Sequence, residues 1–157
     1  LVLFFLAAAT SSPVWSALAR RFGEKPVLLC AMVLAVAAFG WTLTLGAGDV
    51  TAFAVICVLS GATIGADLTL LPAMFAKRMA KIAPNGGQGF GLWSLVSKFT
   101  LAFAAVLLLP LLEGAGFEAG PDNPQAALAM LTWLYALVPS ILKIVAIILL
   151  TLTTLED

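Results

Sequence analysis

The sequence predicts an all-α membrane protein with five transmembrane helices, and three observations support this fold class. Of the 157 residues, 62% are hydrophobic and 10% are charged, whereas soluble domains average about 45–50% apolar and about 25% charged residues. The apolar residues form five long segments without the period-two alternation of a membrane β-strand. Because a backbone in lipid must satisfy its own hydrogen bonds, each segment is expected to be helical.

Each apolar segment has about the length needed to cross a bilayer. A hydrocarbon core about 30 Å thick requires roughly 20 helical residues. The predicted spans are residues 1–18, 26–46, 51–76, 88–112 and 126–154. The first begins within an apolar run and lacks the basic start and cleavage site of a signal peptide. We therefore expect the chain to be a C-terminal piece of a longer protein whose N-terminal half is missing.

Turn-forming residues separate the spans. Pro26 stands where the second span begins, a position that tolerates proline because the first helical N–H has no intrahelical partner. Residues 46–49 predict a tight turn, and residues 83–87 and 114–124 predict loops rich in Gly, Pro, Asp and Asn. Proline also occurs inside three spans, as Pro72, Pro110 and Pro139, where it is expected to kink the helix.

Basic and non-basic loops alternate along the chain. The first and third loops contain Lys and Arg, whereas the second and fourth contain acidic residues and no Lys or Arg. The positive-inside rule places loops rich in Lys and Arg in the cytoplasm. We therefore expect an integral protein, of the kind found in a bacterial inner membrane, with a cytoplasmic C-terminus. The basic loop residues are Arg20, Arg21, Lys25, Lys77, Arg78 and Lys81.

The composition excludes several classes of function. A formal net charge of zero gives no basic face for nucleic acid. Without histidine, the chain cannot form a Ser-His-Asp or Cys-His triad or a His-bound zinc site. Cys30 and Cys57 lie in apolar runs and are interpreted as small buried hydrophobes. We therefore expect no catalytic residues, no metal site and no bound cofactor, and we do not expect an enzyme.

Three ionisable residues lie inside the predicted spans. Asp67, Lys98 and Lys143 each lie about 14–16 Å from the cytoplasmic end of their helix, measured by the helical rise. Such groups are costly in a membrane and usually face a bundle interior or a polar path. Matched depth and opposite charge predict an ion pair between Asp67 and Lys98, either as a static bridge or as part of a coupling network. Lys143 either joins the mechanism or extends toward the headgroups.

Other residues of the spans have both a structural and a functional interpretation. Trp93 is either an interfacial anchor or a surface on which a ligand ring stacks. The other tryptophans, Trp15 among them, and Tyr135 are interpreted as interfacial anchors. Ser94 and the hydroxyl residues near it are candidates to bind a neighbouring helix or a polar solute. Gly61 and Gly65 form a GxxxG pattern, which indicates close helix packing or a smooth sliding face.

Three stretches of the chain carry a family resemblance. Residues 15–26 resemble the short basic cytoplasmic loop of the major facilitator superfamily. Residues 63–76 are similar to the tenth helix of the glycoside-pentoside-hexuronide:cation symporters, the melibiose-carrier group. Residues 89–98 resemble their eleventh helix, where an intramembrane lysine is typical. The resemblance implies that the five spans are helices eight to twelve of a twelve-helix transporter.

The resemblance also implies a function and a role for Lys98. Members of the group move a sugar or related solute together with Na⁺ or H⁺ by alternating access. Lys98 matches the family lysine, which lies near the cation and sugar sites, while the main cation-site carboxylates lie in the first six helices. Two features depart from the family: Lys77 and Ala80 stand where many members have an acidic pair, and residues 85–88 lack the usual arginine.

Two other classes of function compete with a carrier. A membrane-embedded enzyme would need a nucleophile, base or metal cluster at one depth, and the spans offer no such set. A non-transporting scaffold or interaction subunit would have its three intramembrane charges fully paired within this chain. A polar cavity on the face that bears Lys98 would instead favour transport.

Overall fold

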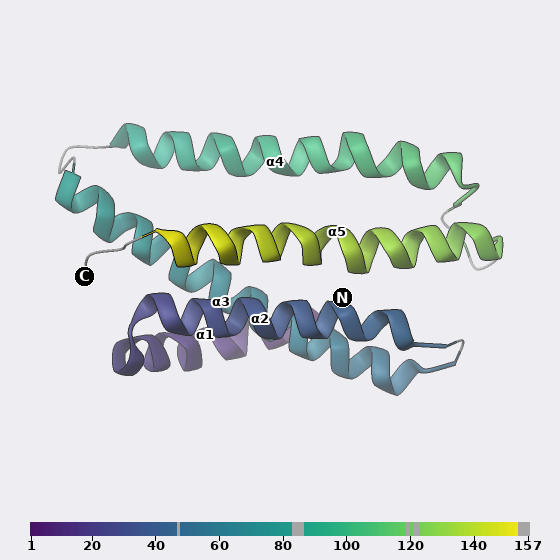
Figure 1. The fold of residues 1–157 in the computed structure, drawn as a ribbon, viewed down its shortest axis with the longest axis horizontal. Helices are drawn as coiled ribbons and strands as arrows, with labels where there is room; N and C mark the ends of the chain where they lie inside the picture. The colour runs from purple at the N-terminus through teal and green to yellow at the C-terminus, as the bar shows by residue number, and fades with distance from the viewer. Residues whose placement is uncertain (47, 83–86, 119, 121–122, 154–157) are drawn as a thin grey trace. The chain divides into compact units, whose positions relative to one another are not determined.

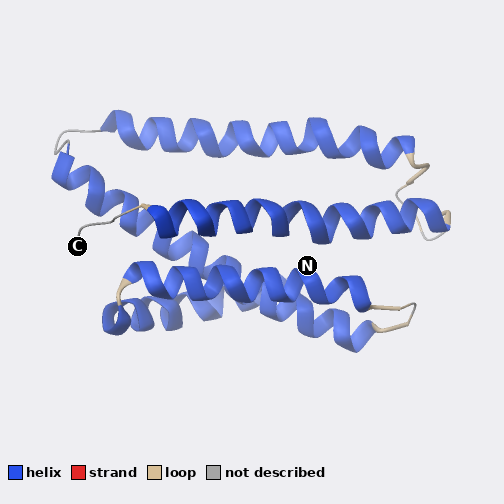
Figure 2. Ribbon diagram, in the orientation of Figure 1, coloured by secondary structure: helices blue, strands red, loops and turns tan. Residues whose placement is uncertain are grey.

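The computed structural model describes residues 1–46, 48–82, 87–118, 120 and 123–153. Within these residues the chain forms helices and no strand (Figures 1 and 2). All five α-helices are long and apolar enough to cross a membrane, which confirms the predicted fold class. The elements are α1 Val2–Phe22, α2 Glu24–Trp41, the short 3-10 helix η1 Thr42–Thr44, α3 Val50–Ile82, α4 Gly87–Gly114 and α5 Gln125–Leu152.

The basic residues expected in loops belong instead to helix ends. Arg20 and Arg21 lie in the last turn of α1, and Lys25 lies in the first turn of α2. Lys77, Arg78 and Lys81 lie in the final turns of α3, which continues to Ile82. Lys, Arg, Ala and Met are good helix formers, and long basic side chains reach the headgroups from a helix end. The predicted loops were therefore too wide, although the order of basic and non-basic ends is unchanged.

The turn between α1 and α2 depends on the backbone conformation of one glycine. Gly23 has φ 91°, a conformation that residues with a side chain rarely adopt. Its N–H donates to the carbonyl of Ala19 at 2.9 Å, which closes the end of α1 before α2 begins. The tight turn predicted at residues 46–49 is supported by two hydrogen bonds between its ends, in which the Gly46 N–H donates to Asp49 Oδ2 and the Asp49 N–H donates to the Gly46 carbonyl. Residues 47 and 83–86 lie outside the described residues.

The chain divides into two compact units. Unit 1 comprises Leu1–Phe75 and Tyr135–Asp157, and unit 2 comprises Ala76–Leu134. Unit 1 contains the main hydrophobic core, in which alanines allow α1, α2 and α3 to approach closely. Side chains from the C-terminal part of α5 pack against this core. Its buried members are Ala19, Val27, Leu28, Ala31, Met32, Ala66 and Leu70, and Ala146, Ile147 and Leu150 of α5 cover it.

The GxxxG pattern of α3 packs against α1 within unit 1. A Cβ atom at Gly61 would overlap the backbone of Phe4, and one at Gly65 would overlap the Ala8 carbonyl and the Ser11 hydroxyl. Both glycines are buried. The pattern therefore brings two helix backbones into direct contact, as the packing interpretation predicts.

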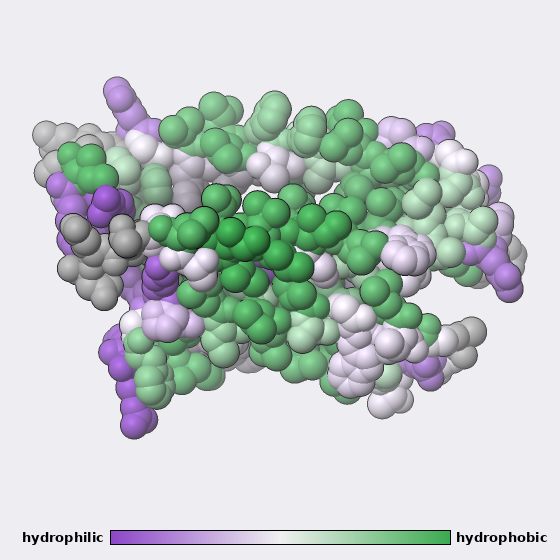
Figure 3. Space-filling model, in the orientation of Figure 1, coloured by the Kyte–Doolittle hydropathy of each residue, from purple (hydrophilic) through white to green (hydrophobic). Residues whose placement is uncertain are grey.

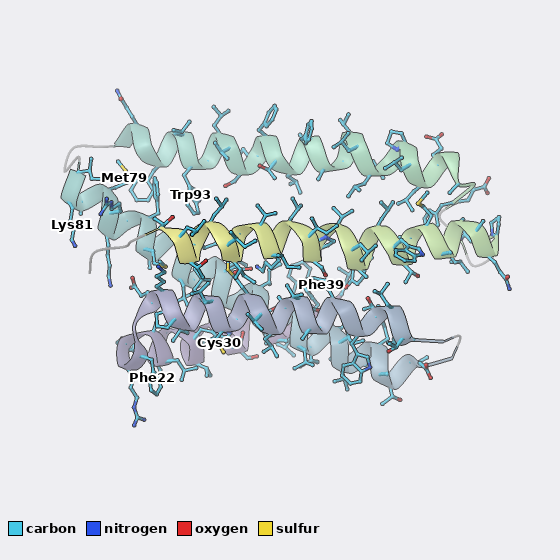
Figure 4. The ribbon with its side chains drawn as sticks, in the orientation of Figure 1. Phe22, Cys30, Phe39, Met79, Lys81 and Trp93 are labelled. Atoms are coloured by element: carbon cyan, nitrogen blue, oxygen red, sulfur yellow. The ribbon has the colours of Figure 1, made fainter. Side chains whose placement is uncertain are left out.

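Unit 2 is built around α4 and has much less buried surface. None of the α4 residues, all of which are described, is buried. The visible surface along α4 is mainly hydrophobic (Figure 3). Its first turn meets the end of α3, where the Met79 side chain occupies the space beside Gly89. Met79 and Lys81 lie on the last turns of α3, and Trp93 lies on α4 (Figure 4).

The two cysteines are free, and neither is fully buried as expected. Cys30 is exposed on α2 (Figure 4), whereas Cys57 on α3 is half-buried. An apolar run that crosses a membrane has a lipid-facing side, so membership of the run does not by itself imply burial inside the protein.

Candidate functional site

An ion pair joins α3 and α5 in the middle of unit 1. Lys143 Nζ donates to Asp67 Oδ2, and the side chains of Lys143 and Asp67 are 20% and 15% exposed, respectively. The predicted Asp67–Lys98 pair is therefore wrong in its partner. Residue counting predicted a shared depth for the three charges, but depth along a helix does not determine the direction in which a side chain points.

The register between α3 and α5 explains why Lys143 is the partner. Both helices run in the same direction through unit 1, with α5 offset from α3 by about 76 positions. Tyr135 lies beside Ser60, and two turns further along each helix Lys143 pairs with Asp67. Because both steps span about two turns, the contacts follow a single seam between the helices.

Asp67 uses only one of its two carboxylate oxygens. Oδ1 is buried and has no hydrogen-bond partner among the described residues. The neighbouring hydroxyls do not serve it, because Thr63 donates to the Ser60 carbonyl at 2.8 Å and Thr69 donates to the Gly65 carbonyl at 2.7 Å. A buried unsatisfied acceptor typically costs about 1–3 kcal/mol. Attraction to the Lys143 ammonium is what holds this carboxylate inside the bundle.

Lys98 lies in a different environment. It belongs to α4 in unit 2, its side chain is exposed, and it has no ion-pair partner among the described residues. Ser94 is also exposed and lies one turn earlier on the same face of α4. The hydroxyls of Ser97 and Thr100 donate to the carbonyls one turn behind them, at 2.8 Å in each case. Trp93 is half-buried beside this polar stretch.

Trp15 forms a hydrogen bond between two helices of unit 1 and does not serve only as an interfacial anchor. Its indole N–H donates to the Ala62 carbonyl at 2.7 Å, and the Ser11 hydroxyl donates to the same oxygen at 3.1 Å. Ala62 lies within the GxxxG pattern, where the backbone of α3 is accessible to side chains of α1. The close contact between α1 and α3 therefore makes the Ala62 carbonyl accessible as an acceptor. In the sequence, the GxxxG pattern indicated this accessible backbone.

Two further contacts could not be inferred from sequence patterns. Lys25 Nζ donates to the carbonyls of Thr151 and Thr153, at 3.4 and 2.7 Å. A lysine at this position satisfies free carbonyls and opposes the negative end of the helix dipole. The α1–α2 junction and the end of α5 therefore lie at the same end of unit 1. Tyr135 contacts Phe39 edge-on, with ring centroids 5.6 Å apart.

The structure thus separates the sequence-predicted candidates into two groups. Asp67 and Lys143 form a pair within unit 1, whereas Lys98, Ser94 and Trp93 lie together on α4 in unit 2. Among the described residues, no group of three or more His, Cys, Asp and Glu side chains could hold a metal ion.

Comparison with known proteins identifies the family. The family model described as MFS/sugar transport protein matches residues 1–157. The chain belongs to this family. No curated protein and no solved structure matches the chain. As a member of the MFS/sugar transport family, the protein is an integral membrane transporter of the major facilitator superfamily, whose members are generally not enzymes.

Proposed function

We propose that the chain is helices eight to twelve of a cation-coupled symporter of the melibiose-carrier group. The transporter moves a sugar or a related small polar solute together with Na⁺ or H⁺, and its N-terminal half supplies the main cation-site carboxylates. The basic helix ends and the C-terminus face the cytoplasm, and a bacterial inner membrane is the proposed location. No cofactor other than the coupling cation takes part.

The exposed ammonium of Lys98 is the observation that carries the coupling proposal. Asp67 lies within α3 and is paired with Lys143 of α5. Lys98 therefore remains a charge at membrane depth without a counter-ion among the described residues. An uncompensated charge in a membrane is costly. Carboxylates of the N-terminal half or polar groups of the solute supply the missing partner.

The coupling follows from competition for those carboxylates. With no cation bound, Lys98 pairs with them and holds the site together. A Na⁺ ion or a proton that enters the site displaces Lys98 from them, which frees its ammonium and the nearby Ser94 hydroxyl to bind the solute. Cation and solute then bind with positive coupling, and the two halves of the transporter rock around the loaded site.

The unpaired state of Lys98 also argues against a scaffold. A non-transporting subunit is expected to neutralise its intramembrane charges internally, as Asp67 and Lys143 do. Asp67 and Lys143 satisfy that expectation, whereas Lys98 has no ion-pair partner among the residues that the structure describes.

The test is solute uptake by the intact transporter in proteoliposomes, using a panel of labelled sugars with an imposed Na⁺ or H⁺ gradient. We expect accumulation above equilibrium with one of the two gradients and none after an ionophore collapses it. Lys98→Met should abolish accumulation, whereas the control Lys81→Met, which removes an exposed lysine from the end of α3, should leave it unchanged. Gradient-driven accumulation by Lys98→Met equal to that of the unmodified protein would refute the coupling role.

A further inference from the structure

The cationic residues at the junction of α1 and α2 differ in what they contact. Lys25 donates to the carbonyls of Thr151 and Thr153, so its ammonium is already engaged by the end of α5. Arg20 and Arg21 are exposed, and neither has an ion-pair partner among the residues that the structure describes. The two guanidinium groups are therefore available to an anion, whereas the Lys25 ammonium is not.

The guanidinium of Arg21 lies over an aromatic ring. Its Cζ atom is 5.3 Å from the centroid of the Phe22 ring. Phe22 is the last residue of α1 and is 59% exposed (Figure 4). A guanidinium that lies over a ring keeps N–H groups with which it can donate to two oxygens of one phosphate. The Phe22 ring therefore restricts the Arg21 side chain without using its hydrogen-bond donors.

An exposed apolar face of α1 leads to these arginines. Val14, Ala17 and Arg21 recur at spacings of three and four residues, so they lie on one face of the helix. All three are exposed, Val14 to 57%. From Val2 to Arg21 the helix rises roughly 28 Å, which is close to the thickness of a hydrocarbon core. An acyl chain that lies along this face therefore has the arginines at the level of its headgroup.

We propose that Arg20, Arg21 and Phe22 form a binding site for the headgroup of an anionic phospholipid, with one acyl chain along the Val14 face of α1. The two arginines donate to the phosphate oxygens, and the Phe22 ring contacts the apolar region just below the headgroup. Such a site ties the α1–α2 junction to a particular class of lipid. It depends neither on the transported solute nor on the coupling cation.

Charge complementarity favours an anionic lipid over other occupants of this face. Arg20, Arg21 and Lys25 outnumber the one carboxylate of the junction, that of Glu24, so the junction has a net positive charge. Phosphatidylglycerol brings a phosphate without a cation, whereas phosphatidylcholine brings a quaternary ammonium that the arginines repel. A soluble anion has no acyl chain to bury against Val14, and an apolar helix that covered Val14 would leave the arginines without a counter-ion.

Native mass spectrometry of the intact, delipidated transporter tests the proposal. The protein in detergent is titrated with dioleoyl phosphatidylglycerol or with dioleoyl phosphatidylcholine, and the apparent dissociation constant of the first bound lipid is measured. We expect phosphatidylglycerol to bind more tightly than phosphatidylcholine. Arg20→Gln and Arg21→Gln should each weaken phosphatidylglycerol binding about fivefold, and the double variant about 25-fold, because each basic group near anionic lipid contributes roughly one such factor.

Two substitutions of the same charge are the matched controls. Lys25→Gln removes a cation from the same junction, and Lys81→Gln removes one from the end of α3. Both should leave the affinity for phosphatidylglycerol nearly unchanged, because the Lys25 ammonium is engaged by the end of α5 and Lys81 belongs to a different helix end. Excess inorganic phosphate should not displace the bound lipid, since it cannot replace the acyl chain on α1.

Three results would overturn the proposal. Equal losses for Lys25→Gln and for the arginine variants would indicate general charge attraction. Displacement by inorganic phosphate would indicate a site for a soluble anion, and equal affinities for the two lipids are expected if another helix covers this face of α1. If one arginine variant fails to fold, the other decides the matter. Lipid binding requires no transported solute, so a protein that moves no tested sugar can still show or lack this site.

Discussion

Several polar side chains of unit 1 bind between helices, whereas the hydroxyls of Ser97 and Thr100 on α4 bind within α4. In unit 1, Trp15 and Ser11 reach the Ala62 carbonyl of α3, Lys143 reaches Asp67, and Lys25 reaches the end of α5. On α4, the hydroxyls of Ser97 and Thr100 bond to their own helix. The comparison teaches that some polar side chains of unit 1 help to hold its helices together, namely Ser11, Trp15, Lys25, Asp67 and Lys143. Lys98 and Ser94 therefore remain available for a solute or for another part of the transporter.

Removal of one member of the ion pair should give the largest loss of stability. Asp67→Asn leaves the Lys143 ammonium in the bundle without a counter-ion and should lower the free energy of unfolding by about 3 kcal/mol. Titration with SDS in mixed micelles measures this quantity. Lys98→Met, which removes an unpaired charge from α4, is the control and should change stability little. Equal losses of unfolding free energy for Asp67→Asn and Lys98→Met would contradict the proposed difference between the paired charges of unit 1 and the unpaired charge of α4.

The double variant Asp67→Asn with Lys143→Met sharpens this prediction. Loss of both charges avoids an isolated ion, so the combined loss should be smaller than the sum of the two single losses. Strict additivity would mean that the two side chains do not interact.

Close packing of α1 on α3 predicts the second largest effect. Gly61→Ala places a Cβ atom against the backbone of Phe4 and should cost about 2 kcal/mol, since neither helix can move without disturbing the core. Gly40→Ala is the matched control, because no atom lies within 4 Å of a Cβ at that position. The same SDS titration compares the two variants, and a tolerated Gly61→Ala would show that the helices separate easily.

Loss of the indole hydrogen bond should have an intermediate effect. Trp15→Phe keeps the aromatic ring but removes the donor to the Ala62 carbonyl, and we expect a loss of about 1 kcal/mol. Trp133→Phe, at an exposed position of α5, should cost less. The reverse order would assign Trp15 to the membrane interface, as the sequence alone predicted.

The contact of Lys25 with the end of α5 predicts the smallest effect. Lys25→Met removes a cation from two carbonyls near the helix terminus and should cost about 0.5 kcal/mol. Salt screens such interactions, so the difference from the unmodified protein should shrink as ionic strength rises. Lys81→Met serves as the control, and an equal effect of the two substitutions would contradict a specific contact.

The sequence predicted the number, type and approximate position of the spans because bilayer thickness and backbone hydrogen bonding constrain them strongly. It also identified the three charged residues within the spans, Asp67, Lys98 and Lys143, which lie inside α3, α4 and α5. It failed to pair them correctly because depth follows from residue counting, whereas the direction of Asp67 depends on how α3 and α5 pack. Helix ends were also misjudged: Lys77, Arg78 and Lys81 extend α3, since hydropathy decreases before the helix ends.

The contact of Lys25 with α5 was beyond sequence reasoning for a different reason. Its partners are backbone carbonyls, which every residue possesses, and they lie more than 120 positions away. A pattern of residue types carries no information about such an acceptor. Trp15 is a partial exception, because its acceptor is the Ala62 carbonyl within the GxxxG pattern, which indicates an accessible backbone but does not identify the donor.

The constant offset between α3 and α5 restricts how the gene for this protein can change in length. One residue inserted into α5 between Tyr135 and Lys143 would rotate the lysine by about 100° away from Asp67 while leaving Tyr135 in place. The same insertion between α4 and α5 would be absorbed before α5 begins. Length variation is therefore expected to accumulate in the connection ahead of Gln125 and to be absent from the nine-residue interval that ends at Lys143.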